Sequence, residues 1–461
     1  MGVTTISKNC VISAPRMRDK GDAIPTDWRF VSVEDIAATR ANAIVGGPFG
    51  SDLVSKDYVS VGVPVIRGQN MAHHYVSGDF AFVSPDKAKQ LQANTARAGD
   101  LIFTQRGTLG QVSLVPGAPF DEYVVSQSQM KLELDARKAS AEYVYQYFVS
   151  APGQKQIIDS AIQTGVPHTN LGILKKYEIP FPPTLMEQEA IGEALSDADA
   201  LIESLSRVLA KKRQVKQGAM QELLSGKKRL PGFDAPWGRV TIGSFTSCTA
   251  GGTPSTNIDA YWGGNIPWMS SGELHLKHVY GVDGRITDEG LRNSSTKWIP
   301  AGCVLIGLAG QGKTRGTVAM NHIPLCTNQS IAAILPVDSY DARFLYFNLD
   351  SRYEELRELS AGDGGRGGLN LNLIRGLEVP IPCLDEQRAI AQLLADMESD
   401  IVVVDSRLAK ARAVKQGMMQ ELLTGRIRLV QPAPNAKLSR ARFADDNIAS
   451  TVAERRTLLN G

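Results

Sequence analysis

The chain has 461 residues, a length that allows two or more domains of the usual size of about 100 to 200 residues. Its 43% hydrophobic and 21% charged residues are typical of a folded globular protein and exclude a disordered or collagen-like chain. Fifty Lys and Arg against 48 Asp and Glu leave a formal net charge of +2, so the total charge points neither to a nucleic acid nor to a membrane.

Cysteines and hydrophobic runs indicate the compartment. The five cysteines are widely spaced without a Cys-x-x-Cys pair, which argues against a disulfide framework or a zinc finger and favours a reducing environment. No signal peptide is recognisable, and no hydrophobic run approaches the about 20 residues of a membrane helix. We therefore expect a cytoplasmic protein that has no membrane partner.

A long internal repeat organises the chain. Lys216–Leu224 recurs almost unchanged as Lys415–Leu423, and Glu187–Ile191 recurs as Glu386–Ile390. Both pairs are offset by 199 residues (415 − 216 and 386 − 187). The repeat predicts a leader, two variable domains that each precede a conserved helix, and a tail. The expected boundaries are 1–24 for the leader, 25–186 and 227–385 for the domains, 187–226 and 386–426 for the helices, and 427–461 for the tail.

Each variable domain combines strand and helix patterns. Short β-branched or apolar runs are separated by Gly, Pro and Asn turns, which predicts strands. A helical pattern follows near the end of each domain, over Ser140–Ala161 and Asp341–Leu359. The fold class is therefore α+β. The clearest strand candidates are Val63–Arg67, Asp100–Thr104, Val112–Val115, Cys303–Leu308 and Ile331–Leu335.

The two conserved segments are predicted to be long helices. Their apolar residues recur at alternating steps of four and three, which is the heptad pattern of a coiled coil, and Pro182-Pro183 and Pro382 precede them. We expect the helices to pack as an antiparallel pair, with the variable domains at opposite ends; an unrelated dimerisation arm is the alternative. The candidates for helix–helix packing and partner docking are Ile191, Leu195, Ile202, Leu205, Leu209, Ile390, Leu394, Ile401, Val404 and Leu408.

The segment Gly307–Thr314 matches the phosphate-binding loop pattern G-x-x-x-x-G-K-[ST]. Such a loop needs a following helix to bind phosphates, whereas Arg315–Pro324 has a strand pattern. The equivalent place in the first domain, Gln105–Gly110, also has glycines but no Lys-Thr. A strand–turn–strand unit explains both copies, and a P-loop ATPase or DNA-translocating factor remains the alternative.

Polar glycine-containing turns occur at matching places in the two domains. Arg and Lys bind phosphates or guanine edges, Gln and Asn pair with adenine, and glycine allows close approach of the backbone. Basic residues also cluster, with a net charge of +7 over 207–229 and +5 over 407–428, which suits a DNA backbone or a helix C-terminus. The DNA-binding candidates are Arg67, Gln69, Asn70, Gln105, Arg106, Ser270, Ser271, Lys313 and Arg315.

Nothing in the sequence demands catalysis. The segment Phe181–Thr184 lacks the polar and aromatic residues of an amino-methyltransferase motif. His275 and His278 lie close to Glu273, but no second ligand pair follows, so zinc is not expected. We predict no catalytic residue and no metal site.

Taken together, 25–429 resembles the specificity subunit of a type I restriction-modification system. The resemblance is carried by Pro182–Gln188 and Ile381–Gln387, which lead into helices ending in Lys-Gln-Gly-x-Met-Gln-Glu-Leu-Leu-[ST]-Gly, and by two glycine-rich domain openings, Gly46–Ser51 and Gly251–Ser255. A specificity protein of a related phage-defence system is a further alternative. The leader and the tail lie outside the resemblance.

The resemblance implies a DNA-binding subunit without catalysis. It implies two target-recognition domains that each recognise half of a split asymmetric target in double-stranded DNA, joined by two long antiparallel coiled-coil helices that set the spacer. These helices would dock two modification subunits, with or without two restriction subunits. S-adenosylmethionine for adenine methylation, and ATP and Mg for cleavage, would be bound by those partners, and this chain would bind no cofactor.

Overall fold

The computed structural model describes residues 24–163, 165–310, 314–359 and 368–430. Lys313, residues 1–23 of the expected leader and residues 431–461 of the expected tail lie outside this range. The chain forms two compact units. Of the described residues, those of 24–198 and 415–430 belong to unit 1, and those of 199–414 belong to unit 2.

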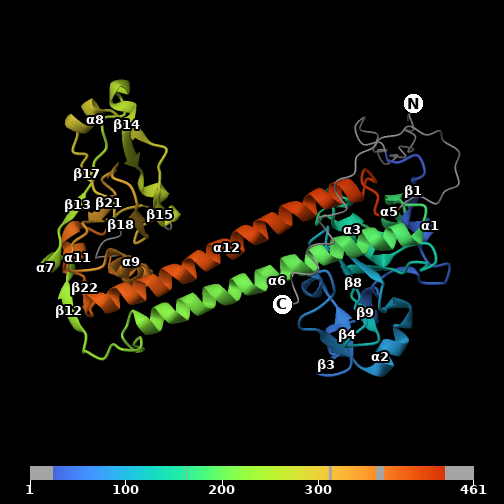
Figure 1. Ribbon diagram of the computed structural model, residues 1–461. Coiled ribbons are helices and arrows are strands. Elements are labelled where there is room, and N and C mark those ends of the chain that lie inside the picture. The colour runs from blue at the N-terminus through green and yellow to red at the C-terminus, as the bar shows by residue number, and fades with distance from the viewer. Residues whose placement is uncertain (1–23, 164, 311–313, 360–367, 431–461) are drawn as a thin grey trace, which may run out of the picture. The chain divides into compact units, whose positions relative to one another are not determined.

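Unit 1 combines three sheets with short helices (Figure 1). A two-stranded antiparallel sheet joins the start of the domain to its end, β1 (Arg29–Ser32) to β11 (Glu178–Phe181). The other two sheets have the strand orders β2-β10-β7-β8 and β3-β5-β4-β9-β6. Their strands are β2 (Ile44–Gly46), β3 (Tyr58–Val59), β4 (Val63–Ile66), β5 (Ala81–Val83), β6 (Thr95–Ala96), β7 (Leu101–Thr104), β8 (Val112–Leu114), β9 (Tyr123–Val125) and β10 (Gln129–Leu132).

The helical segment predicted over Ser140–Ala161 is two helices, α3 (Ala141–Val149) and α4 (Ala151–Asp159). The helical pattern is interrupted at Ser150, because Ser150 has an extended backbone and Pro152 has no N–H to continue the helical ladder. The Ser150 hydroxyl instead accepts a hydrogen bond from Gly153 N and starts α4. The remaining short α-helices of unit 1 are α1 (Val33–Ile36), α2 (Pro85–Gln90) and α5 (Leu171–Lys175).

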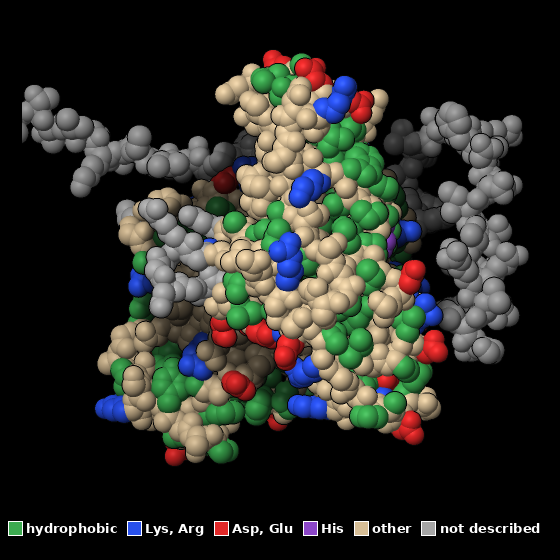
Figure 2. Space-filling view, turned by 90° about the vertical axis from the view of Figure 1, so that its left-hand side faces the viewer, with side chains coloured by type: hydrophobic (Ala, Val, Ile, Leu, Met, Phe, Trp, Pro, Cys, Tyr) green, Lys and Arg blue, Asp and Glu red, His purple; other side chains and the backbone are tan. Residues whose placement is uncertain are grey.

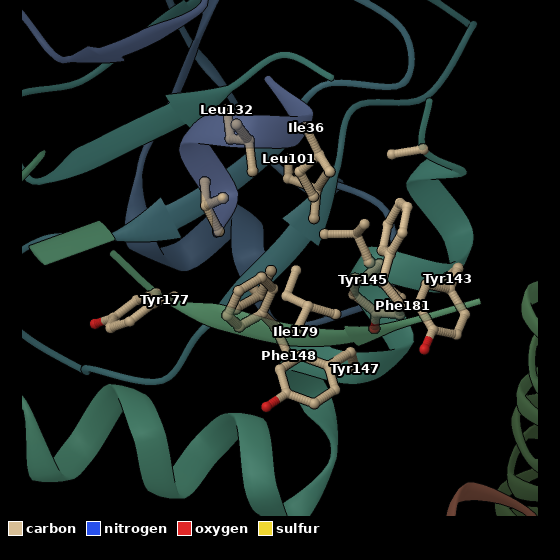
Figure 3. Packing of buried hydrophobic residues seen from close by; sticks show 14 of the residues in the cluster. Ile36, Leu101, Leu132, Tyr143, Tyr145, Tyr147, Phe148, Tyr177, Ile179 and Phe181 are labelled. Carbon is tan, nitrogen blue, oxygen red and sulfur yellow. The ribbon is translucent and has the colours of Figure 1, made fainter. Parts of the chain in front are cut away.

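The core of unit 1 lies between its strands and α3. Tyr143, Phe148, Ile179 and Leu132 are completely buried there, and the Phe148 ring packs near Tyr147 and Tyr177 (Figure 3). The first turns of one long helix and the last turns of the other belong to the same cluster. Burial of these large side chains anchors the domain to the helices, since each contributes about 1.5–3 kcal/mol.

Unit 2 repeats this arrangement. Its sheets have the orders β12-β22, β13-β21-β18-β19-β15 and β16-β14-β20-β17. The strands are β12 (Gly238–Thr241), β13 (Cys248–Ala250), β14 (Trp262–Met269), β15 (His278–Val279), β16 (Arg285–Ile286), β17 (Trp298–Ile299), β18 (Val304–Gly307), β19 (Val318–Asn321), β20 (Leu325–Thr327), β21 (Ile331–Ile334) and β22 (Glu378–Ile381). The α-helices are α7 (Ile242–Phe245), α8 (Asp288–Arg292), α9 (Ala342–Asp350), α10 (Tyr353–Leu359) and α11 (Leu371–Gly376).

The order of elements confirms the α+β class and the internal repeat. The sheet β2-β10-β7-β8 has the same connections as β13-β21-β18-β19, and the pair β1–β11 matches the pair β12–β22. The segment predicted to be helical over Asp341–Leu359 is again two helices, because Ser351 ends α9 and its hydroxyl donates to the Asn348 carbonyl.

Two helices of 39 residues each follow the two domains, α6 (Leu185–Leu223) and α12 (Leu384–Leu422). Their last residues are Leu223 and Leu422, and Gly226 and Gly425 shortly after them both have a φ of +72°, the left-handed conformation with which helices commonly stop. In unit 2 the two helices are antiparallel, since Lys212 pairs with Asp400 and Lys216 pairs with Glu398.

The predicted heptad seam is confirmed in unit 2. Its centre is a cluster of six side chains from the two helices: Ile202, Leu205, Leu209, Ile401, Val404 and Leu408. The four remaining candidates pack elsewhere. Ile191 and Leu195 are completely buried in the core of unit 1, and Ile390 and Leu394 are completely buried in that of unit 2. These four side chains hold each domain on its helices and are not accessible to another subunit.

Candidate nucleic-acid interface

Four loops meet at one end of the sheets in unit 1, and we call them loop cluster 1. They are the glycine-rich loop after β2, the turn after β4, the β7–β8 turn and the β9–β10 turn. Gln105 N donates to Ser128 O at 2.7 Å, and Ser126 N donates to Ile66 O at 3.1 Å. At Gly47 a Cβ atom would lie 1.9 Å from Ser126 O, so only glycine lets these loops approach so closely.

The turn after β4 holds three of the predicted DNA-binding residues, and they have different surroundings. Asn70 is buried, its amide donates to Ser77 O and Asp79 O, and its Oδ1 accepts from Arg67 N. This side chain therefore shapes the turn. Gln69 is exposed and donates to Asp79 O, whereas Arg67 lines a pocket.

Gln105 and Arg106 lie in the β7–β8 turn, as predicted. The backbone of this turn is held on two sides, since Gln105 N donates to Ser128 O and Gln105 O accepts from Thr169 N at 2.9 Å. The Arg106 side chain is exposed. An exposed guanidinium on a rigid backbone suits contact with a nucleic acid, because the hydrogen-bonded turn fixes the position from which the side chain extends.

Unit 2 has the matching loop cluster 2. Asn328 N donates to Met269 O at 3.0 Å and Leu308 N donates to Ser330 O at 2.8 Å, which are the equivalents of the bonds in unit 1. Ser270 donates from its backbone and its hydroxyl to Glu273, so it caps a short 3-10 turn. Ser271 accepts from the Asn328 amide at 3.4 Å. Arg315 is half-buried at the end of the β18–β19 turn.

Sequence reasoning did not select two parts of these clusters. Phe49 lies within the glycine-rich loop Gly46–Ser51 of unit 1 and is 79% exposed, which is unusual for a phenylalanine. The Gln127-Ser128 and Gln329-Ser330 turns lie at the centre of the two clusters, where Gln127 donates to Leu53 O and Gln329 accepts from Thr253. The recurrence of Gln-Ser at the same place in both halves was the signal that could have identified them.

The basic residues of 207–229 are largely paired inside unit 2. Lys212, Lys216 and Arg213 contact Asp400, Glu398 and Asp405 on α12. These three positive charges are therefore each paired with a carboxylate of α12. On the face of the molecule shown in Figure 2, Lys and Arg side chains stand apart from one another among polar and hydrophobic surface.

Comparison with known proteins decides the family. The model of the family described as type I restriction modification DNA specificity domain matches the chain twice, over residues 25–211 and 235–404. The chain belongs to this family. It is therefore a DNA-specificity subunit of a type I restriction-modification system, and such subunits are non-catalytic.

Individual relatives of this specificity subunit agree. The chain is 25% identical over 304 residues to the specificity subunit of the EcoR124I/EcoR124II type I restriction enzyme from Escherichia coli, covering 62% of this chain and 73% of the relative. It is 23% identical over 333 residues to the MjaVIII specificity subunit from Methanocaldococcus jannaschii, covering 66% and 75%. A crystal structure of the type I S subunit from M. genitalium has the same fold, with a TM-score of 0.59 at 16% identity over 88% of this chain and 98% of that one.

The phosphate-loop match in the specificity subunit is part of a β-hairpin. Strand β18 before it pairs antiparallel with β19 after it, with Val304 opposite Met320, and β7 pairs with β8 in the same way in unit 1. No helix starts within the described residues between these strands. The ATPase alternative is therefore not favoured.

Three histidines of the specificity subunit form polar contacts in unit 2. His278 contacts Glu398 at 3.1 Å and His322 at 3.0 Å, while His275 bonds to Gly272 O. Burial favours a higher pKa for Glu398, but the hydrogen bonds from His278 and Lys216 outweigh it and lower that pKa. Across the part of the chain that is described, no group of three or more His, Cys, Asp or Glu could hold a metal ion, and no helix is long and apolar enough to cross a membrane.

Proposed function

We propose that this specificity subunit binds double-stranded DNA and that each loop cluster recognises one half of a split, asymmetric target. The observation that carries the proposal is the duplicated loop cluster, which has the same backbone hydrogen bonds in both units but different side chains. Arg67 of unit 1 corresponds to Ser270 of unit 2, because each precedes a short 3-10 turn and donates its backbone N–H to the third following residue. One scaffold with two sets of side chains suits two different half-sites.

The helices supply the second part of the proposal. Each is continuous over 39 residues, about 58 Å at 1.5 Å per residue, so the pair is stiff enough to fix the unspecified spacer between the half-sites. Because most of the seam candidates are buried, docking of two modification subunits would use other helix positions. Three exposed apolar residues of α6 have heptad spacing, and we call them the α6 stripe: Leu201, Val208 and Val215 are 53%, 42% and 52% exposed.

An exposed apolar row of this kind is typical of a helix that receives a partner helix. A groove of about 450 Å³ also lies in unit 2, lined by residues of α6 such as Met220, by Ile401 and Val402 of α12, and by Asp350 at the end of α9. Both features are on the helices rather than on the loop clusters, so DNA and protein partners would bind different surfaces.

The partners would carry the chemistry. S-adenosylmethionine for adenine methylation would be bound by the modification subunits, and ATP and Mg by restriction subunits where these are present, all in the cytoplasm. Titration calorimetry of the isolated chain with S-adenosylmethionine should then show no binding, whereas its complex with modification subunits should bind it.

The test of the two-half model is an exchange of domains. Residues 230–385 are replaced by the second variable domain of another family member, and the chain is expressed with its modification subunits. Long-read sequencing that detects methylated adenine should show a new second half-site and an unchanged first half-site. An exchange that alters both halves, or neither, would contradict the model.

A further inference from the structure

A polar pocket of about 420 Å³ opens within loop cluster 1. Its lining comes from three of the four loops, namely the segment after Phe49, Arg67 after β4, and the β9–β10 turn Ser126–Ser128. Ser55 and Tyr58 also line it, and no Asp or Glu is among its described lining residues. Arg67 is therefore the dominant charge in the pocket, and the pocket is electropositive.

The guanidinium of Arg67 lacks a partner. Its Nε is buried from solvent without a hydrogen bond, and within the described residues only its backbone N and O are bonded, to Asn70. Leaving a buried charged donor without a hydrogen bond costs free energy. An unpaired donor beside a pocket therefore points to a ligand that accepts its hydrogen bond. Other basic residues of unit 1 do have partners within the protein; Lys87, for example, contacts Asp57 at 3.3 Å.

We infer that this pocket holds one backbone phosphate of the bound DNA and that Arg67 is its anchor; the inference rests on the proposed DNA binding. The shape of the site favours the phosphate over a base edge. Paired bases lie at the floor of a groove and are reached by protruding side chains, whereas the sugar–phosphate backbone is a convex ridge that fits a concave polar pocket. A guanidinium with hydroxyl groups around it is the donor set that suits phosphate oxygens.

The phosphate anchor would act only in the half of the target that is bound by unit 1. In loop cluster 2 the position of Arg67 is taken by Ser270, whose hydroxyl is bonded to Glu273 Oε2 at 3.0 Å. Unit 2 thus has a neutral hydroxyl at the place of the Arg67 cation, and the carboxylate of Glu273 at the place of Asn70. Ser270→Ala is accordingly a matched control at the equivalent place of the same scaffold.

The experiment uses the full chain in complex with its modification subunits and measures DNA affinity between 50 and 200 mM salt, on target and on non-target duplexes. Arg67→Ala should weaken both duplexes by the same factor and reduce the salt slope by about 1. Over this fourfold change in salt, wild type should therefore lose about 3.5-fold more affinity than the variant. Arg67→Lys, which keeps the charge, should retain most of the slope, and Ser270→Ala should retain all of it.

Two further measurements keep the inference falsifiable. Replacing single phosphates by neutral methylphosphonates should reveal one position in the first half-site at which wild type loses affinity and Arg67→Ala does not. The methylated motif should stay the same in Arg67→Ala. Relaxed recognition at one base pair would show a base contact instead, and an unchanged slope in a variant with wild-type thermal stability would also overturn the inference. Failure of the wild-type complex to bind DNA would refute the proposed function itself.

Discussion

Arg229 and Glu386 form a two-point ion pair, with Nε 2.6 Å from Oε1 and Nη2 2.7 Å from Oε2. Glu386 is completely buried at the start of α12, and Arg229 follows the end of α6. The Trp237 indole N–H donates to the same carboxylate at 2.9 Å, and the Arg229 guanidinium lies 5.3 Å from the Trp237 ring centre. The pair thus connects the end of one helix to the start of the other within unit 2.

A similar ion pair occurs in unit 1 at the repeat offset, although the buried indole N–H of Trp28 makes no hydrogen bond to a described residue there. Arg428, which follows α12, bonds to Glu187 near the start of α6, with Nη2 2.7 Å from Oε2, and lies 5.6 Å from the Trp28 ring centre. Asp27 adds two further bonds of 3.1 Å to Arg428. Both 428 − 229 and 386 − 187 equal 199, so the two halves of the chain exchange equivalent arginines and glutamates.

The first prediction concerns these ion pairs. Arg229→Met should lower the thermal midpoint of the protein clearly. The buried carboxylate of Glu386 left without a counter-charge costs on the order of 3–5 kcal/mol. Adding Glu386→Gln to Arg229→Met should recover much of the loss, since a neutral amide oxygen can still accept from Trp237. Lys228→Met, next to it in sequence and well exposed, serves as the control in differential scanning calorimetry; an equal loss in this variant would contradict the explanation.

The second prediction concerns Arg106, whose side chain is exposed on the rigid β7–β8 turn. If it contacts a base of the first half-site, Arg106→Ala should lower discrimination at one position of that half-site by about 1–3 kcal/mol. Binding of a set of single-substituted duplexes measures this, with thermal stability unchanged. Lys155→Ala, on the exposed surface of α4, is the control; unchanged discrimination at every position in Arg106→Ala would remove this residue from the interface.

The third prediction tests the α6 stripe. Val208→Lys should weaken co-purification of the modification subunits, because a charge would replace an apolar contact, while the melting temperature should stay close to that of wild type. Leu205→Lys is the matched comparison. Leu205 lies three residues before Val208 on α6, and its side chain packs between α6 and α12. That variant should instead lower the melting temperature. If Val208→Lys leaves the assembly intact, modification subunits dock elsewhere.

The fourth prediction follows from Asp100, which is buried beside β7. Burial raises the pKa of Asp100 to about 6, against a smaller opposing effect of the hydrogen bond from Arg97 N at 2.8 Å. The native state therefore binds more protons than the unfolded state between pH 3.8 and 6. Its stability from this group is fully present below pH 3.8 and is lost as the pH rises through 6.

Asp100→Asn stays neutral and still offers an acceptor to Arg97, so it should escape this loss. Relative to wild type, its stability should rise by about 2 kcal/mol between pH 4 and pH 7, since most of the effect of a pKa raised from 3.8 to about 6 develops within this pH range. Hydrogen exchange of peptides that cover Leu101–Thr104, measured at both pH values, reports it. Asp159→Asn, which removes an exposed carboxylate on α4, is the control that separates the effect of burial from the effect of removing one charge. A constant difference between Asp100→Asn and wild type would refute the shifted pKa.

Periodic features of the sequence were sufficient for much of the fold. The steps of four and three from Ile202 to Leu209 and from Ile401 to Leu408 predicted the seam, and the glycine turns predicted the hairpins β7–β8 and β18–β19. These features are local: a helix or strand buries one face, and the spacing of apolar residues records which face it is. The repeat offset of 199 residues then predicted that both halves share one fold.

Only the tertiary structure distinguished residues of the same type within a turn. Asn70 and Gln69 are adjacent amides, yet one is buried and bonded to the backbone while the other is exposed. The Arg229–Glu386 pair joins residues 157 positions apart, and the pocket of Arg67 is completed by Ser126–Ser128 from another sheet connection. Such relationships depend on how distant segments pack in space. Sequence spacing alone therefore determined the two long helices, the hairpins and the repeat, while packing decided which polar side chains are buried within the protein and which are exposed.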